Sequence, residues 1–165
     1  DLGTGSGAIL VGFLYYCRDA VGVGVDISTE ALKIAEENGQ NLKITDRVEW
    51  RQGDYLKAFD EEDIFDGIFS NPPYIPTKDI GGLSREVKHE PRLALDGGTD
   101  GLYFYHLLAK GAAEHLKPGG FLAVEFGIGQ ATDILEMFRK SAQYEDFEVI
   151  KDYGGIERAL YCRKK

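Results

Sequence analysis

The segment Asn71-Pro72-Pro73-Tyr74 has the residue types that most directly suggest chemistry in this sequence. Neither proline has an N–H group and each has a fixed φ, so the pair forms a stiff turn that cannot continue a strand. The side-chain oxygen of Asn71 and the carbonyl oxygen of Pro72 can then each accept one N–H of a planar, uncharged NH2 group. Held in this way, the substrate nitrogen points its lone pair at an electrophile.

A sulfonium methyl group is the electrophile that suits this arrangement. As a methyl group transfers, positive charge moves onto the nitrogen, and the two carbonyl dipoles of Asn71 and Pro72 stabilise that charge. The face of Tyr74 adds a cation–π contribution. The proton leaves after transfer, so no general base is required. The alternative is a plain turn, since such residues commonly form turns.

A glycine-rich loop opens the sequence as Asp1-Leu2-Gly3-Thr4-Gly5-Ser6-Gly7. Glycines at alternate positions let the backbone turn tightly and approach a ligand closely. With Ala8, the spacing also satisfies the dinucleotide fingerprint GxGxx(G/A), so the loop alone fits either NAD or S-adenosylmethionine. The carboxylate of Asp1 would repel a pyrophosphate and suits the cationic amino-acid end of S-adenosylmethionine.

Two further acids follow predicted strands. Asp26 ends the second strand, where an acid can hydrogen-bond both ribose hydroxyls. Its alternative role is a helix cap, which Ser28 fills better. Asp54 ends the third strand and could accept a hydrogen bond from an adenine amino group. A solvated turn residue is the alternative for Asp54.

Strands and helices alternate along the chain, which indicates an α/β fold with a mainly parallel sheet. In such sheets, ligands bind at the carboxyl ends of the strands, where all these motifs fall. The stretch from Tyr74 to Asp100 lacks periodicity and is expected to be a functional loop or lid. We expect helices at 7–18, 28–40, 101–116 and 130–142, and strands at 21–26, 47–52, 66–70, 121–126, 147–152 and 159–163.

Composition limits the function further. The 165 residues suit one domain, and no apolar run reaches the roughly 20 residues that a membrane helix needs. The net charge of −9 weighs against direct binding of nucleic acid. The two cysteines, Cys17 and Cys162, do not have the spacing of metal ligands, and the three histidines do not have it either. We therefore expect no metal. A reducing, cytoplasmic setting is the simplest assumption.

These motifs resemble the HemK family, the peptide-chain release factor glutamine methyltransferases. The resemblance extends over essentially the whole chain. The loop after the Asn-Pro-Pro-Tyr motif makes the resemblance specific to this family. The residues that show the resemblance are the glycine loop, Ser70 to Ile75, Glu90-Pro91 with Ala94-Leu95, Asp100-Gly101-Leu102, Asp152-Tyr153-Gly154 and Glu157-Arg158.

The resemblance implies a Rossmann-like class I S-adenosylmethionine-dependent methyltransferase, with a mostly parallel seven-stranded sheet whose last strand is antiparallel. Its product would be S-adenosylhomocysteine, and its substrate the glutamine of a Gly-Gly-Gln motif in a release factor. We expect this sequence to be the catalytic domain, residues 1–165, of a longer chain, without the upstream helical docking domain and most of the first strand.

The implied site residues divide between cofactor and substrate. Glu86 is a further candidate contact in the loop, and for Glu86 and Glu90 the alternative is a solvated carboxylate. We expect cofactor contacts from Asp1, Gly3, Gly5, Asp26, Asp54 and Asn71, substrate contacts from Asn71, Pro72, Pro73, Tyr74 and Glu90, and catalysis by Asn71, Pro72 and Tyr74.

Three other functions stay open. An amine methyltransferase acting on adenine or guanine would use the same Asn-Pro-Pro-Tyr chemistry on a flipped base, but it predicts a basic groove or an added recognition domain. A nicotinamide-dependent oxidoreductase would explain the glycine loop and leave Asn71 to Tyr74 unexplained. A binding module without activity would bind cofactor but transfer no methyl group.

Overall fold

The structure, a computed structural model, describes residues 1–84 and 90–165. These residues form two compact units, and each is described by itself. The N-terminal unit comprises Asp1–Asp63 and Ile68–Asn71, and the C-terminal unit comprises Ile64–Gly67 and Pro72–Lys165. Strand β3 (Phe65–Ser70) is therefore divided between them.

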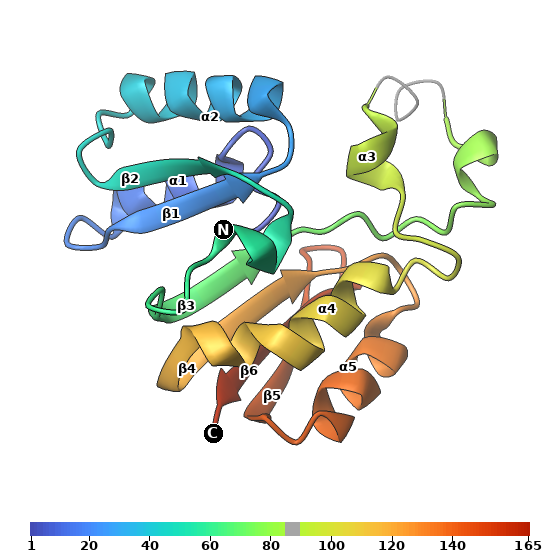
Figure 1. Ribbon diagram of the computed structural model, residues 1–165. Coiled ribbons are helices and arrows are strands. Elements are labelled where there is room, and N and C mark those ends of the chain that lie inside the picture. The colour runs from blue at the N-terminus through green and yellow to red at the C-terminus, as the bar shows by residue number, and fades with distance from the viewer. Residues whose placement is uncertain (85–89) are drawn as a thin grey trace. The chain divides into compact units, whose positions relative to one another are not determined.

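The N-terminal unit alternates helices with parallel strands (Figure 1). Strand β1 pairs in parallel with β2, with Gly22 opposite Val48. Where the sequence predicts the remnant of a first strand, Leu2 forms parallel bridges to Val25 and to Ser70. The elements of this unit are α1 (Ala8–Tyr16), β1 (Gly22–Asp26), α2 (Thr29–Asn41), β2 (Val48–Gln52), the 3-10 helix η1 (Tyr55–Ala58) and the end of β3.

Helix α1 is largely apolar, but it is only partly the buried helix that such a sequence predicts, because Ile9, Tyr15 and Tyr16 are exposed. Leu10, Val11 and Leu14 form a core cluster with Ile44, against which Trp50 of β2 packs. Burial of such side chains stabilises the fold by about 1.5–3 kcal/mol each. This core supports the glycine loop, which leads directly into α1.

The C-terminal unit contains the strand pairings in which β6 takes part. The sheet order is β3-β4-β6-β5, and β6 is antiparallel to both β4 and β5. The antiparallel last strand that the family resemblance implies is therefore confirmed. The elements are η2 (Ile80–Gly82), α3 (Arg92–Leu95), α4 (Tyr103–Gly111), η4 (Ala112–His115), β4 (Leu116–Glu125), α5 (Ala131–Lys140), β5 (Tyr144–Lys151) and β6 (Glu157–Lys164).

The strands differ in detail from the predicted seven. In the part of the chain that the structure describes, six strands form, and Leu2 contributes only its two bridges. The predicted helix 101–116 is shorter, because α4 ends at Gly111 and a 3-10 turn leads into β4 at Leu116. Helices α4 and α5 pack against each other, and α5 also packs on β5 and β6.

The stretch after the Asn-Pro-Pro-Tyr motif folds back on itself. Ile75 forms an isolated parallel bridge with Asp96, donates its N–H to Leu95 O at 3.0 Å, and accepts from Gly97 N–H at 2.9 Å. The short helices η2 and α3 lie within this stretch. The return of the chain to Ile75 brings residues 95–98 beside the residues that follow the motif.

Candidate active site at the strand ends of the N-terminal unit

The carboxyl ends of four chain segments meet in the N-terminal unit. Leu2 is parallel to both Val25 and Ser70, and β1 is parallel to β2. Parallel segments place their carboxyl ends at the same edge, where α/β sheets bind ligands. The residues that follow these ends include Gly3, Asp26, Asp54 and Asn71, all predicted at the cofactor.

The glycine loop has the backbone that its sequence predicts. Gly3, Gly5 and Gly7 have φ values of 68°, 56° and 76°, a region that other L-residues rarely adopt. A Cβ on Gly3 would lie 2.8 Å from the hydroxyl oxygen of Tyr55, whereas a Cβ on Gly5 would meet nothing within 4 Å. Gly5 therefore borders open space, as a residue beside a ligand must.

The Asp1 carboxylate has one satisfied oxygen and one orphaned oxygen. The hydroxyl of Thr4, itself buried, donates to Asp1 Oδ2 at 2.7 Å. Asp1 Oδ1 is buried, and none of the described residues hydrogen-bonds to it. A buried carboxylate oxygen without a partner costs free energy until a donor or a cation reaches it. This atom fits the ammonium group of an amino acid.

Asp26 links the glycine loop to helix α2. Its Oδ2 accepts the Gly5 N–H at 2.8 Å and its Oδ1 accepts the Ser28 N–H at 2.9 Å. Ser28 caps α2, because its hydroxyl accepts the Ala31 N–H at 3.2 Å, as the sequence predicts. Each carboxylate oxygen has a second lone pair, so Asp26 can still accept from a ribose.

Tyr55 lies beside the glycine loop and was missed by sequence reasoning. It has a φ of 51°, and its hydroxyl lies over Gly3. Burial, and then the negative charge of Asp26, raise the pKa of Tyr55 well above its usual range, so the phenol stays neutral. The signal was its place directly after Asp54 at the end of β2, beside the loop.

The structure supports a ligand contact less for Asp54 than for Asp1 and Asp26. Its carboxylate is 45% exposed and forms an ion pair with Lys57, three residues later. It precedes η1 as its N-terminal cap residue, although its side chain makes no capping hydrogen bond. The ion pair fits the alternative of a solvated turn residue.

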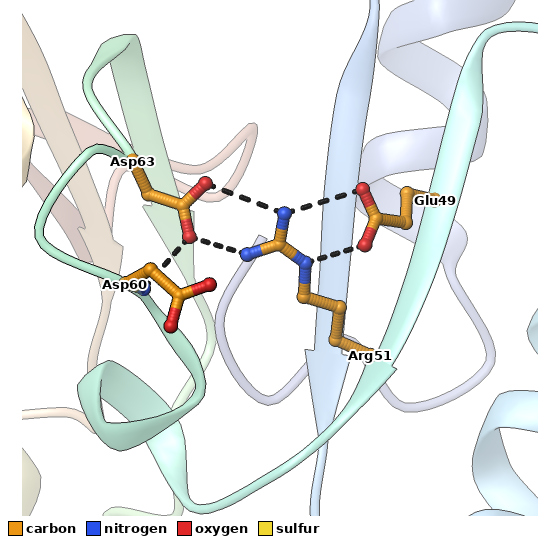
Figure 2. Close-up of polar contacts among 4 residues, drawn as sticks. All are labelled: Glu49, Arg51, Asp60 and Asp63. Carbon is orange, nitrogen blue, oxygen red and sulfur yellow. Dashed lines mark hydrogen bonds and ion pairs between the residues drawn. The ribbon is translucent and has the colours of Figure 1, made fainter.

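Arg51 anchors the segment that contains Asp54 and Tyr55. Figure 2 shows its guanidinium between the carboxylates of Glu49 and Asp63. It donates to Glu49 Oε1 at 2.6 Å and binds Asp63 through Nη1 and Nη2. Asp63 also accepts the Asp60 N–H at 2.9 Å. The two ends of the segment after β2 are thereby joined.

The Asn71 side chain stands free at the end of β3. It is exposed, and none of the residues in 1–84 and 90–165 hydrogen-bonds to its amide. Ser70, directly before it, is buried and donates its hydroxyl to Leu2 O at 2.8 Å. A fixed backbone with an uncommitted amide is what recognition of a substrate NH2 group requires.

In the C-terminal unit, Pro72 and Pro73 are buried and Tyr74 is half-buried. Gln130 donates through Nε2 to Tyr74 O at 3.0 Å. A Cβ on Gly127 would lie 2.9 Å from Cδ2 of the Tyr74 ring, so the ring packs directly on this glycine. Sequence reasoning missed both Gln130 and Gly127.

The remaining candidate residues gain no contacts that define a role. Glu90 is exposed, and Glu86 lies outside the described residues. Within residues 1–84 and 90–165, no three or more His, Cys, Asp or Glu side chains gather as metal ligands would. The same residues include no helix with the length and apolar character to cross a bilayer.

Comparison with known proteins identifies the family. The model of the methyltransferase domain family matches residues 1–125. A release factor glutamine methyltransferase of Moorella thermoacetica is 42% identical over 165 residues, which cover 100% of this chain and 58% of the relative. That of Bradyrhizobium diazoefficiens is 47% identical over 165 residues, or 99% of this chain and 55% of the relative. The chain thus spans little more than half the length of these curated relatives.

Solved structures share the fold. A methyltransferase from Pyrococcus furiosus has a TM-score of 0.72 at 24% identity, covering 99% of this chain and 72% of that chain. An RNA methyltransferase from Salinibacter ruber in complex with S-adenosyl-L-homocysteine has a TM-score of 0.58 at 19% identity, covering 99% and 78%. The Rossmann-like class I methyltransferase fold is confirmed. The chain belongs to the methyltransferase domain family, and its resemblance to the release factor glutamine methyltransferases is borne out by these relatives.

Proposed function

We propose that the chain is the catalytic domain of an S-adenosylmethionine-dependent methyltransferase. Its substrate is the side-chain amide nitrogen of the glutamine in a Gly-Gly-Gln motif of a peptide-chain release factor. The observation that carries this proposal is the exposed Asn71 amide, uncommitted among the described residues, at the strand edge that also holds the glycine loop. The similarity to release factor glutamine methyltransferases supports the choice of substrate.

The cofactor contacts of the proposal lie in the N-terminal unit. Asp1 Oδ1 would receive the ammonium group of S-adenosylmethionine, and Asp26 would accept its ribose hydroxyls. The backbone at Gly3 and Gly5 would approach the cofactor, with open space at Gly5. When bound, S-adenosylmethionine supplies an electrophilic methyl group on a sulfonium. Asp54 and Asn71 are the remaining cofactor contacts of the proposal.

The chain's own residues orient the amide. Asn71 Oδ1 and Pro72 O each accept one N–H of the glutamine amide, which fixes the direction of its nitrogen. An amide nitrogen is a poor nucleophile because its lone pair is delocalised, and orientation can supply several kcal/mol toward the barrier. The two carbonyl dipoles then stabilise the charge that develops on nitrogen. Tyr74 stacks on the planar amide, and the proton leaves after the transfer.

The partner in this proposal is a protein and not a nucleic acid. A net charge of −9 disfavours a polyanion. Pro73 and Glu90 would contact the loop that bears the glutamine. In the longer protein, an upstream helical domain would help to dock the release factor, and the protein would act in the cytoplasm.

Methyl transfer from labelled S-adenosylmethionine tests the function in the full-length protein. Purified release factor and total nucleic acid are offered in parallel. We expect label in the Gly-Gly-Gln peptide and a loss of roughly 10²-fold in kcat for Asn71→Ala. Asn41→Ala, at the exposed end of α2, is the matched control and should keep full activity. Label in nucleic acid alone would replace the proposal by a base amine methyltransferase.

A further inference from the structure

We infer that Gln130 is a positioning residue that sets the backbone of the catalytic Asn-Pro-Pro-Tyr motif from its Tyr74 end. The inference rests on the proposed function, since it concerns how the motif is held for amide methylation. Gln130 directly precedes α5 and is its N-terminal cap residue, yet its side chain makes no capping hydrogen bond. Its amide is used elsewhere.

The Gln130 side chain joins three backbone groups from three segments. Its Nε2 donates to Tyr74 O at 3.0 Å and to Gly101 O at 3.3 Å. Its Oε1 accepts the Gly127 N–H at 2.8 Å. Both ends of the amide are therefore used, and a side chain of this length that ties three loops together fixes their relative places.

The motif depends on hydrogen bonds from other residues because its two prolines cannot donate backbone hydrogen bonds. Pro72 and Pro73 have no N–H to donate, so hydrogen bonds can hold this segment only through carbonyl groups or from the next residues. Tyr74 O is bound by Gln130, and Ile75 is bound by Leu95 and Gly97. Since the φ of Pro73 is fixed, fewer backbone torsions are free to absorb a displacement at Tyr74 before it reaches the Pro72 carbonyl.

Gly97, Gly101 and Gly127 pack closely around Tyr74 and the residue before it. A Cβ on Gly101, whose φ is 79°, would clash with Tyr74 O and approach Gln130 Nε2 to 2.8 Å. A Cβ on Gly97 would lie 2.8 Å from Pro73 O. Because these glycines and Gly127 have no Cβ, the chain can pack closely around Tyr74. This close packing brings the Gln130 amide within reach of Tyr74 O.

The test replaces Gln130 with Met, which keeps the length and removes all three hydrogen bonds. Gln143→Met is a matched control, because Gln143 Nε2 also donates to two backbone carbonyls, Ala109 O and Lys110 O, both at 3.2 Å. In the full-length protein, we expect Gln130→Met to lower kcat for the release factor about ten- to a hundredfold, as a displacement of about 1 Å can. The Kd of S-adenosylhomocysteine should stay within about twofold. Gln143→Met should keep kcat and show a similar decrease in Tm.

Hydrogen exchange separates failure of the inference from failure of the proposed function. The Ile75 amide, which donates to Leu95 O, should lose protection in Gln130→Met and not in Gln143→Met, whatever the substrate is. Unchanged kcat and unchanged Ile75 protection in Gln130→Met would overturn the inference. If Gln130→Met does not fold, Gln130→Glu keeps the acceptor for Gly127 and removes the donor, and the same two readouts decide. A wild type that methylates no glutamine, with Ile75 protection lost in the variant, would overturn only the proposed function.

Discussion

The backbone N–H of Gly5 donates to Asp26 Oδ2 at 2.8 Å, so the two cofactor elements predicted from the sequence are bonded to each other. The other oxygen of Asp26 holds the turn that begins α2 through the Ser28 N–H. One carboxylate therefore orders both the glycine loop and the end of β1. A ligand that binds here meets a preorganised site and spends less free energy on ordering it.

Asp26→Ala should weaken cofactor binding more than loss of a ribose contact alone. The change removes acceptors from two backbone N–H groups, each worth about 0.5–1.5 kcal/mol, in addition to the ribose acceptor. We expect a loss of about a hundredfold in S-adenosylhomocysteine affinity, measured by calorimetry, since each 1.4 kcal/mol is about tenfold. Asp66→Ala removes an exposed acid that pairs with Lys117 and should leave the affinity unchanged. A folded Asp26→Ala protein with normal affinity would contradict the assignment.

Asp1→Asn should discriminate between ligands with and without an amino-acid end. The variant still accepts from the Thr4 hydroxyl but no longer offers a charge at the orphaned Oδ1 position. In the full-length protein we expect S-adenosylhomocysteine affinity to fall at least about tenfold, consistent with about 1.5–3 kcal/mol for a hydrogen bond to a charged group. The affinity for 5′-methylthioadenosine, which lacks the amino acid, should change little. Equal losses for the two ligands would place the ammonium group elsewhere.

The sequence was informative where chemistry is local. Glycines at positions 3, 5 and 7 predict a tight turn, and all three residues adopt the positive φ that glycine permits. Ser28 predicts the start of a helix because its side chain can accept a hydrogen bond from the first turn, and it caps α2. The strand-end positions of Asp26 and Asn71 followed from the alternation of strands and helices.

Contacts between distant residues could not be predicted in this way. Gln130 reaches Tyr74 across 56 positions, and no periodicity marks such a pair. Lys117-Pro118-Gly119-Gly120 looks like the end of a helix, yet it lies in β4. Proline is tolerated near the start of a strand, and Gly119 supplies the positive φ of 75° that the irregular backbone requires there. Only the three-dimensional pairing decides between the two.

Gly5→Ala and Gly7→Ala should separate binding from folding. Both positions have positive φ, which costs an alanine about 1–2 kcal/mol. A Cβ on Gly7 would also lie 3.0–3.1 Å from Trp50, Ala35 and Val11, whereas Gly5 borders open space. We expect Gly7→Ala to have the lower free energy of unfolding in urea. Gly5→Ala should lose more cofactor affinity than its stability change explains, because its methyl group would extend into the open space where the proposal places the cofactor. The reverse order would contradict this placement.

The Arg51 cluster predicts how stability depends on acid pH. The hydrogen bond from Arg51 to Glu49 is the main reason that the pKa of Glu49 lies below its usual value. A carboxyl group with a lowered folded pKa stabilises the folded state above its unfolded pKa of about 4.3. That contribution is lost as the pH falls through the lower, folded value. Glu49→Gln should therefore make the fall of stability below about pH 4.3 shallower.

Urea unfolding at a series of pH values measures this slope. Glu136→Gln is the matched control, since Glu136 and Glu49 are both 58% exposed, and Glu136 pairs with Lys140. Arg51→Ala should remove the same pH-dependent contribution as Glu49→Gln and, in addition, release Asp63. Because Asp63 is only 18% exposed, loss of its partner leaves a carboxylate poorly solvated, and Arg51→Ala should be the less stable variant at neutral pH. Equal stability of Arg51→Ala and Glu49→Gln at neutral pH would show that the Arg51–Asp63 pair does not anchor the segment that contains Asp54 and Tyr55.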